Sequence, residues 1–425
     1  MKILDKFFLY IFLILQVNFF DLINIRNSFL NGWSSYSQKK LFLIFVFIYI
    51  FLRLILYNAH FNPKIMRRHF SPFIIFLLIS VVILIFGTLY KFDQTLFATI
   101  LIAYYFFILL LYFPFSEYLN TWENWRYIIR RFIIFSSIVS IIKLVQSYIL
   151  LHFGKLIFYL NTNFDYSTAL QRNFNVLGFT RIASSVDFVA FSVFIMLIYK
   201  AIKGAIFSKL KDNVILFFNV LFLICVGQSR GYLIIIVVII LSILLMRVLK
   251  SVSKSIQIFF LVLILLIAMV CVGILIDKVF FVGSRSISMS IRQYAYQYYL
   301  KNIFNNGWFA FGFARDDLYG SLIHGQSINY NGQIISANFD DVGIIGFLGK
   351  FGMLGVLNII VFLWSSIQCF AESKYKQLSF LTYIFLFGCW ISLSPFDSQR
   401  IFYLPIILVF LDFLTTRDKG EVEHI

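Results

Sequence analysis

The residue of this 425-residue chain best placed for chemistry is an arginine between two apolar segments. In Gln228-Ser229-Arg230-Gly231 almost no loop separates the two runs, so the guanidinium must lie at or just below a membrane surface. Charge at that depth is costly and usually has a partner or a function. A guanidinium can grip a phosphate with two parallel hydrogen bonds, whereas an ammonium is a point charge. Arg230 therefore suggests a site for a diphosphate.

Candidate proton acceptors lie in the last third of the chain. Asp340 and Asp341 directly precede an apolar run, and His324 is the only histidine of the polar segment before them. A carboxylate or an imidazole can orient or deprotonate a hydroxyl group. The two aspartates could equally cap the amides of the following helix, and a lone loop histidine is often a surface residue. Both alternatives stay open for these residues.

Four further ionisable residues, Arg53, Lys143, Asp187 and Lys350, interrupt apolar runs. Arg53 stands near the end of its run, so its long side chain is expected to reach the membrane surface. Lys143 is expected to form a structural ion pair. Asp187 and Lys350 are open between ion pairing and function.

The elements that position these residues must be membrane helices. With 61% apolar and 13% charged residues, no water-soluble fold could bury the hydrophobic surface. The long apolar runs do not alternate with polar residues, which favours helices over a barrel. So few charges exclude a nucleic-acid binder or a disordered regulator despite a net charge of +17.

Cofactor and metal motifs do not appear in the sequence. There is no Gly-rich phosphate loop, no dinucleotide fingerprint and no cluster with metal-ligand spacing. The 4 cysteines fall inside apolar runs without disulfide or zinc spacing. We therefore expect neither a cofactor nor a metal.

The runs predict an all-α polytopic membrane protein with about 12 transmembrane helices. The expected helices cover residues 7–23, 41–57, 70–90, 94–113, 128–151, 182–202, 213–227, 231–249, 256–276, 342–368, 377–394 and 400–415. With both termini inside, the inner segments carry 19 Lys and Arg and the short outer segments 9, as the positive-inside rule favours.

Arginine dominates the outer face of the second part of the chain in this topology. The basic residues there are seven arginines and two lysines: Arg172, Arg181, Arg230, Arg285, Arg292, Arg315, Arg400, Lys278 and Lys301. Lysine is the commoner residue inside, so a general preference for arginine does not explain the pattern. The alternative is that each arginine merely reaches lipid headgroups.

One long outer loop divides the chain into helices one to nine (1–276), the loop (277–340) and helices ten to twelve with a tail (341–425). Within it, residues 284–304 have a helical apolar spacing and predict a helix on the outer leaflet. The aromatic run 308–313 is expected to be a second interfacial anchor. Asn331-Gly332 predicts a turn between short extended pieces.

The chain resembles the superfamily of O-antigen polymerases and O-antigen ligases. The resemblance covers roughly residues 170–368 and rests on the order and spacing of several motifs. These are Gly178-Phe179-Thr180-Arg181-Ile182-Ala183-Ser184-Ser185, Ser229-Arg230-Gly231, the Arg292 region leading into Trp308 to Gly312, Asp341-Val342-Gly343-Ile344-Ile345-Gly346, and Lys350-Phe351-Gly352-Met353-Leu354-Gly355.

This resemblance implies a glycosyltransferase in a bacterial inner membrane whose active site and large loop face the periplasm. Its donor would be an oligosaccharide on polyprenyl diphosphate, used without a cofactor. Arg181, Arg230 and Arg292 would bind the diphosphate, and Asp340, Asp341 or His324 would act on the acceptor hydroxyl. Expected partners are this substrate and membrane lipids, with a chain-length regulator as a further candidate and no nucleic acid.

The resemblance leaves two enzymes and one transporter to distinguish. Where ligases commonly carry His-Asn, this chain has Phe339-Asp340-Asp341, which favours a polymerase of lipid-linked repeat units. The alternatives are a ligase that passes the glycan to the lipid A core and a flippase for lipid-linked oligosaccharides. A flippase is disfavoured because the two halves show no convincing repeat.

Overall fold

The computed structural model describes residues 3–24, 37–57, 68–160, 170–182, 184–202, 210–248, 256, 263, 286–305, 309–330 and 333–416. Helices dominate this part of the chain, as expected. The α-helices are α1 (Ile3–Gln16), α2 (Ser37–Tyr57), α4 (Ser71–Lys91), α5 (Leu96–Ala103), α6 (Tyr112–Tyr118), α7 (Trp122–Phe153), α9 (Val186–Ile202), α10 (Leu210–Phe222), α11 (Arg230–Val248), α13 (Ser286–Asn305), α14 (Asp316–His324), α15 (Gly343–Glu372), α16 (Lys376–Ser392) and α17 (Leu404–Thr416). The 3-10 helices are η1 (Asn18–Asp21), η4 (Tyr104–Leu111) and η9 (Phe339–Asp341), and η5 (Leu223–Gly227) is a π-helical turn.

Several helices are compatible with a membrane protein. Among the described residues, five helical segments are long and apolar enough to cross a membrane: Ser71–Lys91, Leu96–Tyr118, Leu210–Gly227, Arg230–Arg247 and Gly343–Glu372. Shorter apolar helices cover Leu41–Leu56, Lys376–Ile391 and Leu404–Thr416. The expected helix 256–276 lies outside the described residues except for Ile256 and Leu263. The count of twelve spans stays a prediction.

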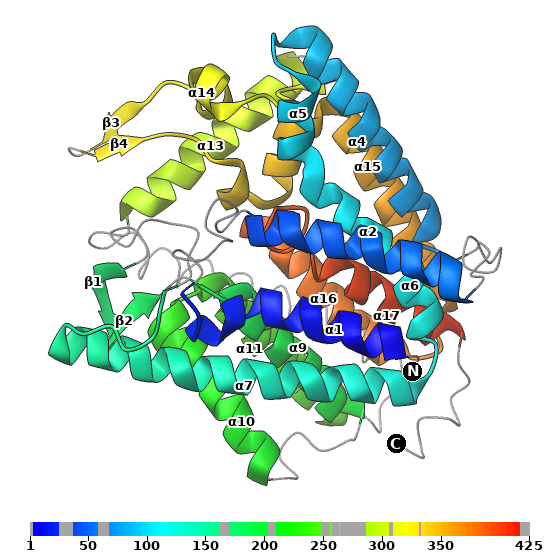
Figure 1. Cartoon of the computed structure of the whole chain (residues 1–425), viewed down its shortest axis with the longest axis vertical. Helices are drawn as coiled ribbons and strands as arrows, with labels where there is room; N and C mark the ends of the chain where they lie inside the picture. The colour runs from blue at the N-terminus through cyan, green and yellow to red at the C-terminus, as the bar shows by residue number, and fades with distance from the viewer. Residues whose placement is uncertain are drawn as a thin grey trace. The chain divides into compact units, whose positions relative to one another are not determined.

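The chain forms two compact units, and each is made of separate stretches. Unit 1 comprises Met1–Ile65, Leu110–Ile236 and Arg417–Ile425, and unit 2 comprises Met66–Leu109 and Val237–Thr416. In unit 1 the long helix α7 runs beside α1, α9 and α10 (Figure 1). In unit 2, α15 packs against α4, α13, α16 and α17 (Figure 1). The three consecutive segments expected from the sequence stay a prediction.

Two β-hairpins accompany the helices; the first corrects the expectation of a purely α-helical chain, and the second lies where short extended pieces were predicted. Strands β1 (Leu170–Val176) and β2 (Phe179–Ile182) pair antiparallel around Leu177-Gly178, whose φ angles are 51° and 80°. Two consecutive positive φ angles suit a two-residue hairpin turn. Strands β3 (Ile328–Tyr330) and β4 (Gln333–Ile335) pair from Tyr330 and Gln333 outward, so they flank the predicted Asn331-Gly332 turn.

Helix α15 is broken at Gly352, where a continuous helix was expected. Gly352 has φ 58° and ψ −136°, a conformation that glycine adopts easily. A break of this kind leaves carbonyl groups of the preceding turn in need of donors. The amides of Phe311 and Gly312 donate to the carbonyls of Gly349 and Lys350, at 3.2 and 2.9 Å. The segment before α14 thereby supplies hydrogen-bond donors to the turn that precedes the break.

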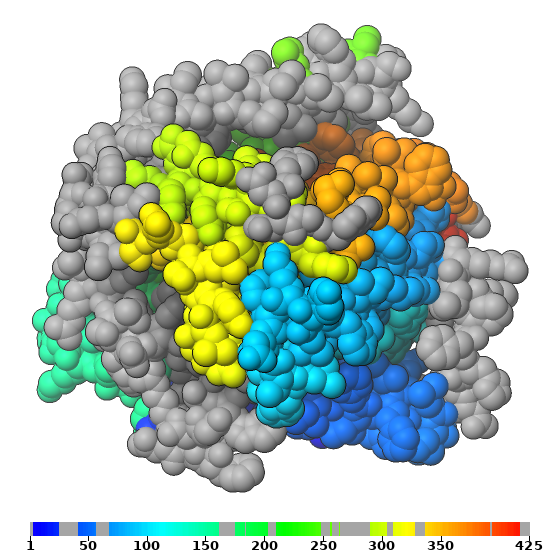
Figure 2. Space-filling view, turned by 90° about the horizontal axis from the view of Figure 1, so that it is seen from above, coloured from blue at the N-terminus to red at the C-terminus, as the bar shows by residue number. Residues whose placement is uncertain are grey.

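In the aromatic run after α13, Phe311 and Phe313 are buried within unit 2 and are not part of an interfacial anchor, while Trp308 lies outside the described residues. Phe311 and Phe313 are each 1% exposed. Phe311 packs against Tyr299 of α13 and Phe339, and Phe313 against Phe351. Close approach of this segment to α4 explains the burial, because the amide of Phe313 donates to Thr88 Oγ1 at 3.0 Å. Figure 2 shows α14 (yellow) beside the end of α4 (light blue). The rings of Tyr319 and Phe92 lie in contact in a tilted arrangement, with their centroids 4.8 Å apart.

Two buried ion pairs stabilise unit 1. Arg53 of α2 pairs with Asp5 and Glu117, and its side chain is only 6% exposed. This corrects the expectation that Arg53 reaches the membrane surface. Lys143 of α7 pairs with Asp21 and also donates to Ser184, and both side chains of that pair are 1% exposed. Lys143 is therefore structural, as expected.

Removal of the Lys143 ammonium should destabilise the protein strongly. In Lys143→Met the Asp21 carboxylate keeps its burial but loses its counter-charge, which costs about 3–5 kcal/mol. We expect a large fall in the midpoint of thermal unfolding of the purified protein. The exposed Lys155→Met variant is the matched control and should change stability by less than about 0.5 kcal/mol. Adding Asp21→Asn to Lys143→Met should recover part of the loss, and equal stability of Lys143→Met and wild type would contradict the assignment.

Candidate functional site

The predicted site residues divide between the two units. Arg181 lies on β2 and Arg230 opens α11, both in unit 1. Unit 2 holds the other four: Arg292 on α13, His324 at the end of α14, and Asp340 and Asp341 in η9. Each unit therefore presents its own group of charged residues.

In unit 1 the strand that carries Arg181 packs against the turn that leads to Arg230. The strand is β2 and the turn is η5, which ends three residues before Arg230. Ser147 of α7 fixes this strand by donating to the Thr180 carbonyl at 2.6 Å. η5 is a π-helical turn, and Gln228 after it has a positive φ of 47°, so the chain reverses sharply before Arg230. Such π-helical irregularities are frequent at functional sites.

Two helices begin near this turn. α9 starts at Val186 and α11 at Arg230, and η5 packs against α9. Asp187 in the first turn of α9 accepts a hydrogen bond from Tyr232 of α11 at 2.5 Å. This hydrogen bond joins the first turn of α9 to the first turn of α11, so Asp187 has a structural role. Helix N-termini attract anions through their unbonded amides, so arginines beside two of them make an environment suited to a phosphate.

The charged group of unit 2 is centred on Lys350, beside the break in α15. Its Nζ lies 3.3 Å from the hydroxyl of Tyr105 and 3.9 Å from Oδ1 of Asp340. The ammonium also lies 4.9 Å from the ring centroid of Phe339. The Lys350 side chain is 19% exposed and that of Asp340 is 40% exposed, so the pair can be reached from outside.

The two aspartates of η9 come directly before the N-cap residue of α15. The N-cap position is Val342, and no side chain accepts a hydrogen bond there. Asn338 instead caps η9 by accepting from the Asp340 amide at 3.2 Å. The Asp340 carboxylate is thus directed to Lys350, and the capping explanation does not apply to it.

His324 is held by acceptors on both ring nitrogens. Nδ1 lies 2.5 Å from the carbonyl oxygen of Ala337, and Nε2 lies 2.5 Å from Oδ1 of Asp316. A carbonyl oxygen can only accept, so Nδ1 carries a proton. The Asp316 carboxyl group engages Nε2, and a role of His324 as a base requires that contact to open.

Tyr299 of α13 lies next to this group and was not singled out in the sequence. Its ring stacks on Phe339 at a centroid distance of 4.5 Å, and the residue is fully buried. Its hydroxyl has no hydrogen-bond partner among the described residues. Burial raises the pKa of this phenol, and the nearby Asp340 and Asp341 charges act in the same direction.

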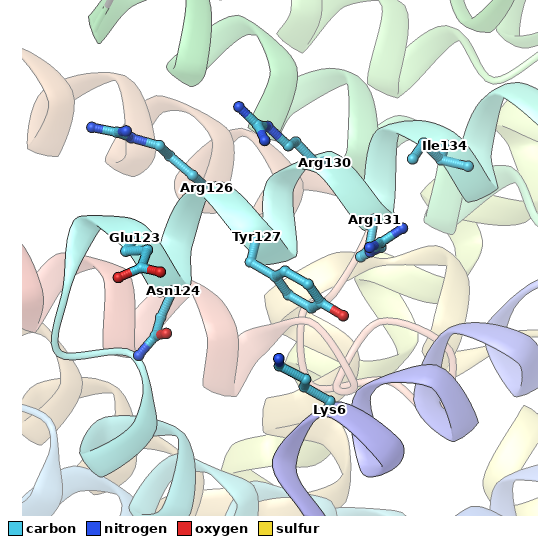
Figure 3. Close-up of a pocket in the computed structure, with 8 residues that line it drawn as sticks. All are labelled: Lys6, Glu123, Asn124, Arg126, Tyr127, Arg130, Arg131 and Ile134. Atoms are coloured by element: carbon cyan, nitrogen blue, oxygen red, sulfur yellow. The ribbon is translucent and has the colours of Figure 1, made fainter. Parts of the chain in front are cut away.

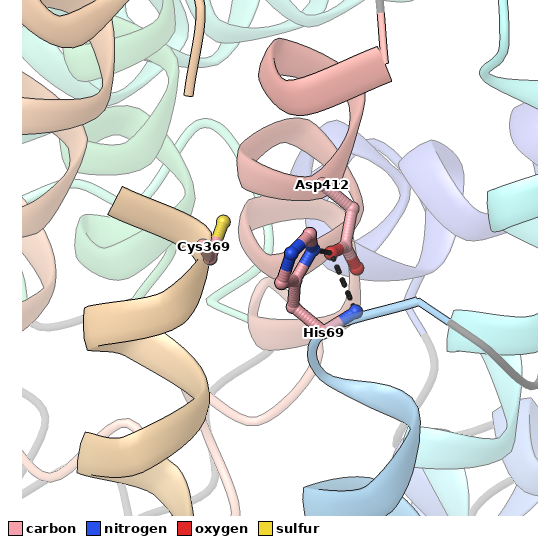
Figure 4. A group of neighbouring side chains, drawn as sticks. All are labelled: His69, Cys369 and Asp412. Atoms are coloured by element: carbon pink, nitrogen blue, oxygen red, sulfur yellow. Dashed lines mark hydrogen bonds and ion pairs between the residues drawn. The ribbon is translucent and has the colours of Figure 1, made fainter. Parts of the chain in front are cut away.

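A third group lies at the other end of α15 (Figure 4). Ligand atoms of His69, Cys369 and Asp412 lie within 4.8 Å of one another, so this group could hold a metal ion. The imidazole hydrogen-bonds to Asp412 at 3.2 Å and to Glu372 at 3.0 Å. The three positions are far apart in the sequence, which explains why no spacing motif revealed them.

Comparison with known proteins adds no relationship. No family model matches the chain, and no curated protein matches it.

Replacing Tyr299 by phenylalanine should stabilise the protein. A buried hydroxyl without a partner costs about 1–3 kcal/mol, and Tyr299→Phe removes it while the ring stacking is retained. The matched control is Tyr298→Phe on the same helix, because the Tyr298 hydroxyl donates to the Leu322 carbonyl at 2.6 Å. Thermal unfolding should show a higher midpoint for Tyr299→Phe and a lower one for Tyr298→Phe. A lower midpoint for both would show that Tyr299 has a hydrogen-bond partner.

The His69 cluster should make stability depend on pH. The hydrogen bond to Asp412 raises the pKa of His69, against burial, and the Asp412 and Glu372 charges add to the rise. A raised pKa means that the folded state favours the imidazolium. Its stabilisation is therefore complete below the unfolded pKa of about 6.5 and is lost as the pH rises through the folded pKa. His69→Gln should lower the unfolding midpoint most at acid pH, and a deficit independent of pH would contradict this assignment.

Proposed function

We propose that the protein is a glycosyltransferase of a bacterial inner membrane that polymerises lipid-linked oligosaccharide repeat units. The proposal follows the resemblance to O-antigen polymerases and ligases. The observation that carries it is the packing in unit 1 of β2, with Arg181, against the turn that leads to Arg230. Guanidinium groups and helix N-termini both favour phosphate oxygens, so we assign the diphosphate to Arg181 and Arg230.

The reaction moves a glycan from its diphosphate carrier to a sugar hydroxyl. The bond between the anomeric carbon and the diphosphate oxygen breaks, and a glycosidic bond forms to the acceptor oxygen. The acceptor proton passes to a carboxylate, and polyprenyl diphosphate leaves. Arg181 and Arg230, with Arg292 as a third candidate, would stabilise the negative charge that develops on the leaving oxygens.

The acceptor side of the proposal rests on Asp340. Its partly exposed carboxylate can accept a hydrogen bond from a sugar hydroxyl, and Lys350 at 3.9 Å balances its charge. Asp341 is the second candidate for this role. His324 is the third, since both of its nitrogens already have acceptors.

The proposed setting follows from the charge distribution in the sequence. The charge bias favours an orientation with both termini in the cytoplasm, in which Arg181, Arg230 and η9 would face the periplasm. The polyprenyl chain of the donor would lie against the apolar helices, among membrane lipids. A chain-length regulator is a further candidate partner.

The deciding experiment is to incubate purified protein with lipid-linked repeat units. We expect a ladder of longer glycans on the lipid carrier. Transfer to added lipid A core without a ladder would identify a ligase. Movement of the repeat across reconstituted vesicles, with no new glycosidic bond, would identify a flippase and overturn the proposal.

Arg230→Lys gives a sharper test of the phosphate site. This variant keeps the charge but loses one of two parallel hydrogen bonds, each worth about 1.5–3 kcal/mol, so polymerisation should slow about ten- to a hundredfold or more. A headgroup anchor would tolerate lysine. The matched control is Arg247→Lys at the other, exposed end of the same helix, which should polymerise normally. Full-length polymer from well-expressed Arg230→Lys would remove Arg230 from the site.

A further inference from the structure

Unit 1 contains a basic pocket that the proposed reaction does not use. It lies between the start of α7 and α1 and has a volume of about 350 Å³ (Figure 3). That volume is within the range of small-molecule sites, ~300–1,000 Å³. Four cationic side chains line it, Lys6, Arg126, Arg130 and Arg131, against one acidic side chain, Glu123. The lining therefore carries a clear excess of positive charge.

The geometry of the pocket leaves donors available to an anion. Tyr127 forms the floor between two cations, with Lys6 Nζ 5.7 Å and the Arg131 guanidinium 4.8 Å from its ring centroid. The Nε atoms of Arg126 and Arg131 are buried without a hydrogen-bond partner among the described residues. Asp5, the acidic neighbour of Lys6, is already paired with Arg53. The positive charge of the lining is therefore not balanced by Asp5, and an anion bound in the pocket would balance it.

The pocket continues into an apolar stripe along α7. Ile134 closes the lining, and the stripe follows at helical spacing through Ile138, Ile141, Val145 and Tyr148. Each of these side chains is between 42% and 47% exposed, so the described protein leaves the stripe uncovered. From Ile134 to Tyr148 the helix rises about 21 Å, which exceeds half of the ~30 Å hydrocarbon core of a bilayer.

We infer that this pocket binds the headgroup of an anionic phospholipid, such as phosphatidylglycerol, whose acyl chain lies along the α7 stripe. A free phosphate would satisfy the cations but would leave the stripe uncovered. A ligand with a phosphate head and a hydrocarbon tail matches both features with one molecule. Basic pockets beside membrane helices are known sites for anionic lipid headgroups. This lipid site is separate from the proposed diphosphate site at Arg181 and Arg230.

Native mass spectrometry of the delipidated full-length protein, titrated with phosphatidylglycerol or phosphatidylcholine, tests this inference. We expect phosphatidylglycerol to bind more tightly. The combined variant Arg126→Gln, Arg130→Gln and Arg131→Gln should weaken its binding at least tenfold. The matched control removes the same charge at exposed sites elsewhere, Lys211→Gln, Arg247→Gln and Lys301→Gln, and should bind as the wild type does. Equal weakening in both variants would overturn the site, because it would show attraction by net charge alone.

A second comparison separates the lipid from a free anion. Ile138→Ser with Ile141→Ser should weaken phosphatidylglycerol binding and leave the binding of glycerol phosphate, which has no acyl chains, unchanged. If inorganic phosphate displaces phosphatidylglycerol at equal concentration, or if the stripe variant binds the lipid normally, the pocket is an anion site and the lipid assignment is wrong. Neither readout requires polymerisation, so failure of the proposed function leaves this test intact.

Discussion

Two backbone hydrogen bonds determine the form of unit 2 around its charged group. They run from the amides of Phe311 and Gly312 to the carbonyls of Gly349 and Lys350, in the turn before the break at Gly352. In apolar surroundings an unmade backbone hydrogen bond is too costly to be left open. The 309–313 segment supplies the donors for two carbonyls of the turn before the break. The same contact brings α13 and η9 against α15, which places Asp340 beside Lys350.

Length and apolarity predict some helices of this protein locally, whereas the expected helix 94–113 is divided into α5, η4 and the start of α6. The runs at 70–90 and 231–249 correspond to α4 and α11 with nearly the expected ends. The break in α15 could not be predicted in the same way. Gly352 was visible within a glycine-rich motif, but its conformation depends on donors supplied from residues 311 and 312, about 40 positions earlier. The β1–β2 hairpin could not be predicted from apolar alternation, because three successive polar residues, Gln171-Arg172-Asn173, interrupt the pattern in β1.

The sequence indicates which charged residues are candidates for the site, but only partly which residues contact them. Arg230 and Asp340 are candidates because a charged side chain next to an apolar run is costly and usually has a partner or a function. Their neighbours Tyr232, Tyr105 and Tyr299 did not, since tyrosine is common in this chain and a single tyrosine carries no motif. Arg53 was misjudged for a similar reason. Its position near a helix end suggested an exposed charge, but Asp5 and Glu117 come from other helices.

The buried ion pairs of unit 1 bear on how the chain is made. Synthesis proceeds from the N-terminus, and domains form as their residues appear. Asp5 precedes Arg53, and Asp21 precedes Lys143, so in both pairs the carboxylate is synthesised before its cation. For a chain that enters the bilayer as proposed, the carboxylate partner of each cation has been synthesised before α2 or α7 leaves the insertion machinery. Neither cation then has to cross into lipid alone, and the order of the residues itself assists biogenesis.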